Sequence, residues 1–310
     1  MKRRHLLGTL AALPLAHALA APPRAIAQRP LARVIVDNDF AGDPDGLVAL
    51  AHQLLAPTTR TVLVTTSALD AKLAGLAGLD PTSTATAGAR LAREMLRRFF
   101  PSARPPVVAG DGMDGAAARA IVAEALRDDP LPLVLACGGP LANVAAALRL
   151  RPDIAGRMSL VWIGGLADGG AEYNLSTDIA AARTVFEDSR LPVLQIPAEE
   201  YRRFQVAVAE LETTFRTISP LAAWLVDRYR RLPPFVRLAG TLTFGDSPLV
   251  TATAFDPAAT PFAVRPVRRI LDDGSHGDVI PGRDVRVAHG LDPRLNLADF
   301  AALLRRNAPA

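Results

Sequence analysis

Five oxygen-bearing side chains crowd into the segment DNDFAGDPDG: Asp37, Asn38, Asp39, Asp43 and Asp45. Four of them are carboxylates, which repel one another unless a hard cation lies among them. Oxygen ligands of this kind suit calcium or magnesium better than zinc. The segment therefore predicts a cation site, although a solvated acidic turn would have the same composition.

An EF-hand calcium loop is one interpretation of this spacing. The four aspartates and Gly42 fit positions one, three, six, seven and nine of such a loop. Position five, however, is Ala41, and position twelve is Val48 where the loop needs a bidentate glutamate. The apolar VIV before the segment also predicts a strand where an EF-hand has a helix. The sequence therefore argues against an EF-hand.

The segment also resembles the Asp-x-Asp loop of magnesium-dependent phosphatases of the haloacid-dehalogenase type. In that family a Ser or Thr follows a second strand, as in VTTS here, and a late motif follows, as in GDS at 245–247. Ala41 replaces the expected hydroxyl residue, and Val250 replaces the expected late acid. Beyond the N-terminal segment, Lys72 is the only lysine that could hold a phosphate. This phosphatase remains an alternative.

Apolar runs rich in β-branched residues recur along the chain, with helical patterns between them. The predicted strands are 34–36, 62–64, 107–109, 133–136, 160–163 and 193–196. The predicted helices are 47–55, 86–100, 116–127, 142–149 and 179–188. This alternation predicts an α/β fold with a Rossmann-like, doubly wound, mainly parallel sheet. Ligands of such sheets bind beyond the carboxyl ends of the strands, where the acidic segment begins.

Two other stretches interrupt the alternation. Helical patterns at 206–218 and 221–230, separated by Ser219-Pro220, predict an inserted helical pair within 198–239 that caps the sheet. The Ala-, Gly- and Thr-rich stretch at 74–90 predicts a loop near the site. No internal repeat is evident, so we expect one domain over 28–310.

Four separated motifs resemble those of the inosine/uridine-preferring nucleoside hydrolases. DNDFAGDPDG is similar to the family's Asp-x-Asp-x-Gly-x-Asp-Asp loop, and LVLACGGPLANVAAALRLRPDI (133–154) resembles its strand, Gly-Pro-Leu-Thr-Asn turn and helix. LVWIGG (160–165) and AEYNLSTDIAAARTVF (171–186) resemble its next strand, Ala-Glu-Phe-Asn motif and helix. FGDSPLVTATAFDP resembles the late motif. The resemblance runs from about Val34 to Leu304.

The resemblance implies a hydrolase that cleaves the N-glycosidic bond of ribonucleosides to free base and ribose, with calcium as cofactor. Asp39 would be the general base that takes a proton from a calcium-bound water. The implied calcium ligands are Asp39, Asp43, Asp45, Asp246 and the backbone carbonyl of Ala142. The implied ribose-binding residues are Asp43, Asp45, Asp70, Glu172 and Asn174. Asp37 and Asn143 would support these ligands from behind.

The acidic loop departs from the family pattern, which ends in two adjacent aspartates. Aligning Asp43 with the first of them leaves Pro44 at the second, and aligning Asp45 with the first leaves Gly46 at the second. We expect a one-residue expansion in which Asp43 and Asp45 share the metal and ribose roles. The sequence leaves open which of them binds the metal.

Two further departures concern the leaving base and the ribose. Gly245 stands where many family members carry a histidine able to protonate the leaving base. Tyr229, in the second predicted helix of the inserted pair, is a candidate wall for that base. The loop GGLADGGAEYN (164–174) lacks the asparagine that precedes the Ala-Glu-Phe-Asn motif in the family.

Residues 1–27 have the pattern of an export signal. Lys2, Arg3 and Arg4 precede an apolar run from Leu6 to Ala20, and small-x-small cleavage sites follow. The paired arginines resemble a twin-arginine signal, and general secretory export is the alternative. The run is too short to span a bilayer, so we expect a periplasmic or secreted protein with no membrane contact after cleavage.

Charge and cysteine content bound the partners. The N-terminal segment carries four cations and no acid, which account for the formal net charge of +4 and leave the remainder near neutral. Nothing therefore favours nucleic acid as a partner. The single cysteine, Cys137, rules out an intrachain disulfide. We expect a small-molecule nucleoside as ligand, and the resemblance implies a homodimer or homotetramer.

A third possibility is a protein that kept the fold but lost turnover. The glycines at 46 and 245 stand where the family has acidic and basic groups, which would suit a non-catalytic periplasmic protein that binds calcium or a ribosyl ligand. Ribose release from a nucleoside distinguishes the hydrolase from this binder and from the phosphatase.

Overall fold

The computed structural model describes residues 26–308 apart from 103, 111–114 and 234. The predicted export signal at 1–27 thus lies almost wholly outside the described residues. Within the described residues, no helix combines the length and the apolar character that a membrane crossing requires.

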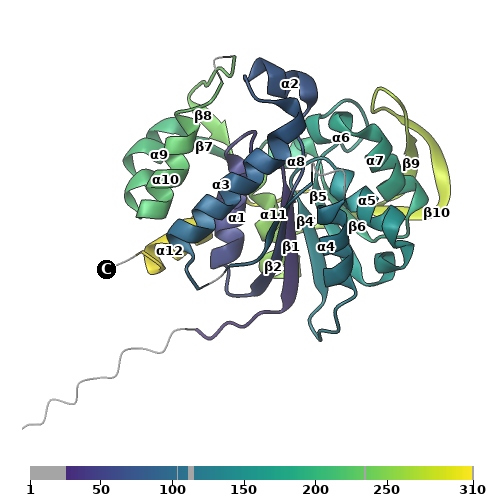
Figure 1. Cartoon of the computed structure of the whole chain (residues 1–310), viewed down its shortest axis with the longest axis horizontal. Coiled ribbons are helices and arrows are strands. Elements are labelled where there is room, and N and C mark those ends of the chain that lie inside the picture. Colours follow the sequence, from purple (N-terminus) through teal and green to yellow (C-terminus); the bar gives the residue numbers. More distant parts are fainter. Residues whose placement is uncertain (1–25, 103, 111–114, 234, 309–310) are drawn as a thin grey trace, which may run out of the picture.

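A single eight-stranded sheet forms the centre of the molecule (Figure 1). Its spatial order is β3-β2-β1-β4-β5-β6-β10-β9. The strands are β1 (Ala32–Asn38), β2 (Thr59–Thr66), β3 (Val107–Ala109), β4 (Leu133–Cys137), β5 (Met158–Ile163), β6 (Val193–Ile196), β9 (Phe262–Ile270) and β10 (His276–Ala288). All neighbours pair in parallel except β9, which runs antiparallel to β10. The mainly parallel, doubly wound sheet predicted from the sequence is confirmed.

Helices cover both faces of the sheet, because successive side chains of a strand point to opposite sides. In β1, Val34 and Val36 belong to one hydrophobic cluster, whereas Ile35 belongs to the other. The first cluster includes side chains of α1 (Asp45–Leu55), α3 (Thr84–Phe99), α10 (Pro220–Tyr229), α11 (Pro248–Ala254) and α12 (Pro293–Arg306). The second includes those of α4 (Ala116–Ala125), α5 (Ala142–Leu150), α7 (Ile179–Arg183) and the π-helix Thr184–Asp188.

Short elements complete the described chain. The remaining α-helices are α2 (Ala71–Leu76), α6 (Tyr173–Thr177), α8 (Ala198–Tyr201) and α9 (Val208–Thr213). The 3₁₀ segments are Pro81–Ser83, Pro152–Gly156, Phe215–Thr217 and Pro257–Ala259. All six predicted strands and five predicted helices are present, with ends shifted by a few residues and the last helix continued as the π-helix.

The predicted inserted helical pair is only half right. The second helix is α10, where the Ser219 hydroxyl accepts a hydrogen bond from the Ala222 N–H and Pro220 occupies the first turn. The first, expected at 206–218, is confirmed only in part: α9 and the 3₁₀ segment Phe215–Thr217 lie within this range, but Gln205–Ala207 is strand β7, which pairs with β8 (Thr241–Thr243). Pairing with a strand distant in the sequence overrides the local helical pattern.

The loop predicted at 74–90 is also wrong, because most of this stretch belongs to α2 and α3. Its small residues have a packing role instead. A Cβ built on Gly88 would lie 3.2 Å from the Ala41 nitrogen and 3.4 Å from Phe40 Cβ. Small residues on α3 thus allow the helix to pack directly against the acidic segment.

The order of the strands determines where a ligand site can lie. The chain builds outward from β1 to β3 on one side and from β4 to β6 on the other, so β1 and β4 flank the point at which the order reverses. Ligands of open α/β sheets bind beyond the carboxyl ends of the strands at such a point. The acidic segment at the end of β1 and the Gly138-Gly139 turn at the end of β4 lie there.

Candidate functional site

Four carboxylates meet beyond the carboxyl end of β1. Asp39 and Asp43 lie in the loop after this strand, Asp45 is the first residue of α1, and Asp246 directly precedes the turn into α11. Asp45 Oδ2 accepts a hydrogen bond from the Asp246 backbone N–H at 3.2 Å. The structure thus joins two segments about 200 residues apart, and Asp45 rather than Asp43 makes this contact. We call these four side chains the acidic cluster.

Asn38 holds Asp246 in this cluster, a role that the sequence did not assign to it. Its Nδ2 donates to Asp246 Oδ2 at 2.8 Å, and both residues are buried. A Cβ built on Gly46 would lie 2.6 Å from Asn38 Oδ1, and one on Gly138 would lie 2.3 Å from Asn38 Nδ2. The glycines therefore make room for the Asn38 amide. A second aspartate at position 46 would collide with it.

The environment of the acidic cluster disfavours ionised carboxylates. Burial, followed by the charge of neighbouring carboxylates, raises the pKa of Asp39 to about 7 and the pKa values of Asp45 and Asp246 as well. Asp43 lies at the rim of the cluster, and the residue as a whole is exposed. Its carboxyl group is nevertheless surrounded by enough protein for desolvation to raise its pKa to about 6. Each group thus resists ionisation in the presence of the others.

Compensating positive charge is missing from the protein itself. Within the described part of the chain, no Lys, Arg or His side chain forms an ion pair with any member of the acidic cluster. Nor do three His, Cys, Asp or Glu side chains of the described residues stand close enough together to form a ready-made metal site. The donor chemistry suits a hard cation, whereas a compact ligand set would need these side chains to move closer together.

Asp37 lies beneath this cluster and is fully buried. Asn143 Nδ2 donates to its Oδ2 at 2.7 Å, and the Thr65 hydroxyl donates to the same oxygen. Burial nevertheless raises the pKa of Asp37 above its usual value, with these hydrogen bonds opposing the shift. Asp37 and Asn143 therefore tie the ends of β1, β2 and α5 together.

Glu172, predicted to bind ribose, is held by three hydrogen bonds. Its Oε2 accepts from the backbone N–H groups of Gly165 at 2.7 Å and Leu175 at 3.1 Å. The Tyr201 hydroxyl donates to its Oε1 at 2.8 Å. Tyr201 was missed in the sequence because it lies in α8, outside the motifs quoted above.

Asn174, the other residue of that motif, presents a free acceptor. Its Nδ2 donates to the carbonyl oxygens of Gly138 and Ile163, each at 3.0 Å. Its Oδ1 is buried and has no hydrogen-bond partner in the described residues. A ligand hydroxyl that donates to this oxygen would satisfy it.

Asp70 is primarily a helix cap in this structure. Its side chain accepts from the Leu73 N–H at 2.9 Å at the start of α2. Its own backbone N–H donates to the Tyr173 hydroxyl at 3.4 Å. That hydroxyl lies close enough to the Asp39 carboxylate to oppose the rise in its pKa. Asp70 thus lies close to the acidic cluster through Tyr173, while its ribose contact remains a prediction. Ala142 is the first residue of α5, and the metal role of its carbonyl remains a prediction too.

Two tyrosines border the position where the family's histidine would stand. A Cβ built on Gly245 would lie 3.0 Å from Asp45 Oδ2 and 3.3 Å from Tyr201 Cδ2. The buried Tyr229 hydroxyl has no hydrogen-bond partner in the described residues, and its pKa is raised by burial and by the charges of Asp43, Asp45 and Asp246. The phenol of Tyr229 therefore faces the acidic cluster.

Comparisons with known proteins place this chain in a family. A family model described as inosine-uridine preferring nucleoside hydrolase matches residues 34–272. The pyrimidine-specific ribonucleoside hydrolase RihA of Salmonella arizonae is 33% identical over 117 residues, which are 34% of this chain and 37% of that protein. The matched segment thus spans little more than a third of that relative.

Two solved structures share the fold. A plant nucleoside hydrolase, PpNRh1, has a TM-score of 0.66 at 19% identity. The matched region covers 90% of this chain and 99% of the PpNRh1 chain. An inosine-guanosine nucleoside hydrolase has a TM-score of 0.67 at 15% identity, and the matched region covers 88% of this chain and 98% of that chain. At such identities the likeness establishes the fold alone. The family model, which spans most of this chain, shows that the protein belongs to the inosine-uridine preferring nucleoside hydrolase family.

Proposed function

We propose that this protein hydrolyses the N-glycosidic bond of ribonucleosides to free base and ribose. The observation that carries the proposal is the meeting of the acidic cluster with Glu172 and Asn174 at the point where the strand order reverses. Glu172 lies near enough to Asp246 for its charge to raise the pKa of that carboxyl. Carboxylates suited to a hard cation and groups suited to sugar hydroxyls thus lie together at the carboxyl edge of the sheet in a member of this family.

Calcium is the cofactor that we propose. Asp39, Asp45 and Asp246 would hold it, with Asp43 at the rim and the Ala142 carbonyl as a further oxygen ligand. When bound, calcium lowers the pKa of a coordinated water and holds it in position for attack. Its charge would also relieve the repulsion within the acidic cluster.

Separate residues of the chain would have separate roles in the reaction. Asp39 would accept the proton of the attacking water while the water oxygen bonds to C1′ and the bond from C1′ to the base nitrogen breaks. The base nitrogen keeps the bonding electron pair and takes a proton from solvent. A base with a pKa near the working pH is efficient in this role, which typically contributes roughly 10²–10⁴-fold. Glu172 would accept a hydrogen bond from a ribose hydroxyl, and the free Oδ1 of Asn174 would accept another.

The test uses purified protein with calcium and a panel of purine and pyrimidine ribonucleosides. Reducing sugar and free base are measured together, since hydrolysis releases them in equal amounts. The expected result is release from at least one nucleoside, lost after exhaustive chelation and restored by calcium. Binding of nucleosides without any release would support the non-catalytic alternative, and phosphate release from phosphate monoesters would support the phosphatase.

We also propose that residues 1–27 direct export, since their composition matches a signal segment. In a bacterial host, the protein is expected in the periplasmic or extracellular fraction. Replacing Arg3 and Arg4 by lysine is expected to keep it in the cytoplasm if the twin-arginine route is used. Unchanged export of that variant would indicate the general secretory route, and cytoplasmic retention of the wild-type chain would contradict export itself.

A further inference from the structure

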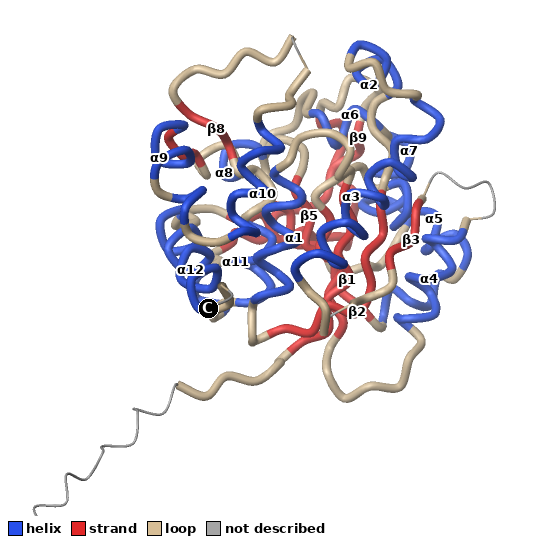
Figure 2. Tube along the Cα trace, turned by 60° about the vertical axis from the view of Figure 1, so that its left-hand side comes forward, coloured by secondary structure: helices blue, strands red, loops and turns tan. Residues whose placement is uncertain are grey.

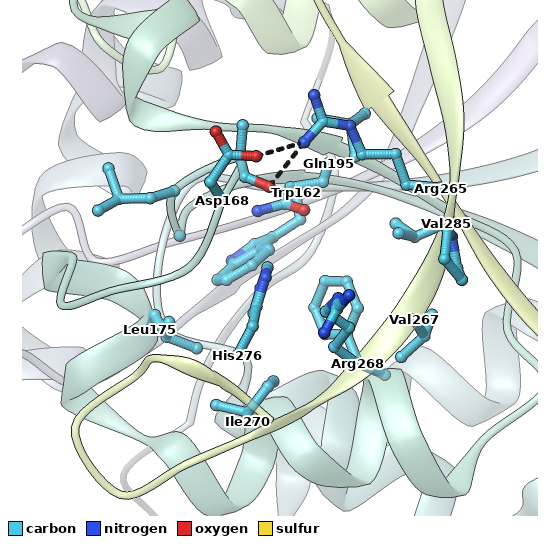
Figure 3. Close-up of a pocket in the computed structure, with 16 residues that line it drawn as sticks. Trp162, Asp168, Leu175, Gln195, Arg265, Val267, Arg268, Ile270, His276 and Val285 are labelled. Carbon is cyan, nitrogen blue, oxygen red and sulfur yellow. Dashed lines mark hydrogen bonds and ion pairs between the residues drawn. The ribbon is translucent and has the colours of Figure 1, made fainter. Parts of the chain in front are cut away.

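A pocket lies beneath the hairpin of β9 and β10. It does not include the acidic cluster, but two of its lining residues, Gly165 and Leu175, donate backbone hydrogen bonds to Glu172. It encloses about 500 Å³, a size typical of small-molecule sites. Figure 3 shows its lining, which comes from β5, β6, β9, β10, the loop after β5, α6 and the π-helix Thr184–Asp188. None of the predicted calcium- or ribose-binding residues lines it. A ligand of this pocket would therefore lie outside the acidic cluster.

The inner wall of the pocket is apolar and buried. Trp162, Val267, Val285 and Val287 line it, and each is no more than 8% exposed. Trp162 meets Phe186, another lining residue, edge to face with ring centroids 5.4 Å apart. These rings and branched side chains favour a ligand with a compact apolar or aromatic body.

The mouth of the pocket is positively charged. Arg265, Arg268 and His276 line it, and Asp168 is the one carboxylate among the lining residues. Arg265 donates to Asp168 at 2.8 Å and to the Ala167 carbonyl at 3.0 Å, as Figure 3 shows. Asp168 is largely exposed, so this ion pair is weak and offsets only part of the charge.

Arg268 is the guanidinium left without a counterion. Its Nη1 donates to the Gly277 carbonyl at 3.0 Å, and no carboxylate of the described residues forms an ion pair with it. His276 lines the same pocket. Partial burial and then the charge of Arg268 lower the pKa of His276, which keeps this imidazole uncharged at neutral pH and leaves Arg268 as the cation beside it. An anionic group at this position would gain charge-assisted hydrogen bonds.

The pocket is built from a backbone arrangement that few residues permit. Gly165 has φ of 66° and Gly169 has φ of 83°, so the loop between them turns with residues in the left-handed region. A Cβ on Gly169 would lie 2.7 Å from His276 Cγ. The Gly170 N–H donates to the Gly274 carbonyl at 2.9 Å, which ties this loop to the turn of the hairpin. These contacts hold Ala167 and Asp168 at the mouth.

We propose that this pocket binds a small aromatic anion, with its ring against the apolar wall around Trp162 and Val267 and its carboxylate or phosphate at Arg268. The charge balance excludes a cationic ligand from the same position, because two guanidinium groups face a single exposed carboxylate. The proposal goes beyond the proposed hydrolysis and does not depend on it.

The experiment measures binding by isothermal titration calorimetry, without calcium and with a chelator present, so that a bound metal cannot attract the anion. The probes are phenyl phosphate and benzoate as anions, benzyl alcohol as the neutral analogue and benzylammonium as the cation. The full wild-type protein is expected to bind at least one of the two anions saturably and the other two probes more weakly. The better anion shows whether a phosphate or a carboxylate is preferred.

Variants locate the site. Arg268→Gln is expected to weaken anion binding roughly 10- to 100-fold, the value of a charge-assisted contact. Arg268→Lys should retain part of the affinity. Arg269→Gln is the matched control, because Arg269 neighbours Arg268 in β9 but does not line the pocket and is exposed beside Glu187. Asp39→Asn should bind like wild type.

Several results would overturn the proposal. These are no saturable anion binding to the wild-type protein, equal affinity for benzyl alcohol, or wild-type affinity in Arg268→Gln. Loss of binding in Asp39→Asn would move the site to the acidic cluster and would contradict the proposal as well. Every measurement here is of binding without metal. A failure of the anion-binding proposal is therefore distinguishable from a failure of the proposed hydrolysis.

Discussion

The Tyr201 hydroxyl donates a hydrogen bond to Glu172 Oε1 across 2.8 Å. Tyr201 ends α8 after β6, whereas Glu172 lies in the loop after β5, so this bond joins two neighbouring strand ends. Glu172 Oε2 is already engaged by two backbone N–H groups. The carboxylate therefore has one orientation, set by the protein before any ligand arrives.

Tyr201→Phe tests this arrangement by removing only the hydroxyl. We expect the KM for the best nucleoside to rise several-fold, because Glu172 becomes less well positioned for the ribose, with a smaller change in kcat. Steady-state kinetics at constant calcium provide the measurement. An unchanged KM would show that Tyr201 has no part in orienting Glu172. A Glu172→Gln variant provides the comparison, and Tyr201→Phe should add little to its loss.

Asp39→Asn tests the proposed general base. The amide keeps the size of the carboxylate but cannot accept the proton of the attacking water. With calcium, we expect kcat to fall roughly 10²–10⁴-fold. In calcium-free buffer near pH 8, we expect a thermal unfolding temperature equal to or above that of wild type, since a desolvated charge is removed. Activity within a few-fold of wild type would show that another group is the base.

The acidic cluster also predicts how stability depends on pH without calcium. The pKa of Asp39 is raised to about 7 and that of Asp43 to about 6, above the value of 3.8 expected in an unfolded chain. At a pH between 3.8 and the raised pKa values, the folded state binds more protons than the unfolded chain. These groups therefore favour folding most below about pH 4, and this contribution is lost as the pH rises through about 6 and 7. The buried His52 opposes this trend, because its pKa is lowered.

The difference between wild type and Asp39→Asn isolates the contribution of the acidic cluster. In calcium-free buffer, the melting temperature of wild type relative to the variant should fall between pH 5 and pH 8. Calcium should raise the melting temperature of wild type most at pH 8, where the ligands are deprotonated. If calcium stabilises the protein equally at pH 5 and pH 8, these carboxylates are not its ligands.

Gly46→Ala probes the space that Asn38 occupies. A helical glycine replaced by alanine usually gains about 0.5–1 kcal/mol of stability, but a Cβ here would lie 2.6 Å from Asn38 Oδ1. We therefore expect a loss of about 1–3 kcal/mol by overpacking, measured by denaturant unfolding.

Gly75→Ala in α2 is the matched control for that change. A Cβ on Gly75 would have no neighbour within 4 Å, so the expected effect is neutral or stabilising. Asn38→Ala combined with Gly46→Ala should recover part of the lost stability, because the clash is removed. A stabilising effect of Gly46→Ala alone would contradict the packing described above.

Much of the framework was accessible from local patterns. The six strands from β1 to β6 were predicted because each is a short β-branched run between helical patterns, a signal carried by neighbouring residues. The C-terminal hairpin was not predicted. In β9, Val264 is 63% exposed and Pro266 interrupts the run, so the strand lacks the continuous apolar pattern of a buried one. It forms because β10 pairs with it and with β6.

The sequence by itself determined the acidic segment, the strand before it and the family motifs, since each depends on residues adjacent in the chain. Only the tertiary structure decided that Asp45 contacts Asp246, that Asn38 holds Asp246, and that Tyr201 orients Glu172 (Figure 2 shows the fold that brings these segments together). The physical reason is distance along the chain. Contacts between residues about 30 to 200 positions apart depend on strand order and helix packing, which no local pattern specifies.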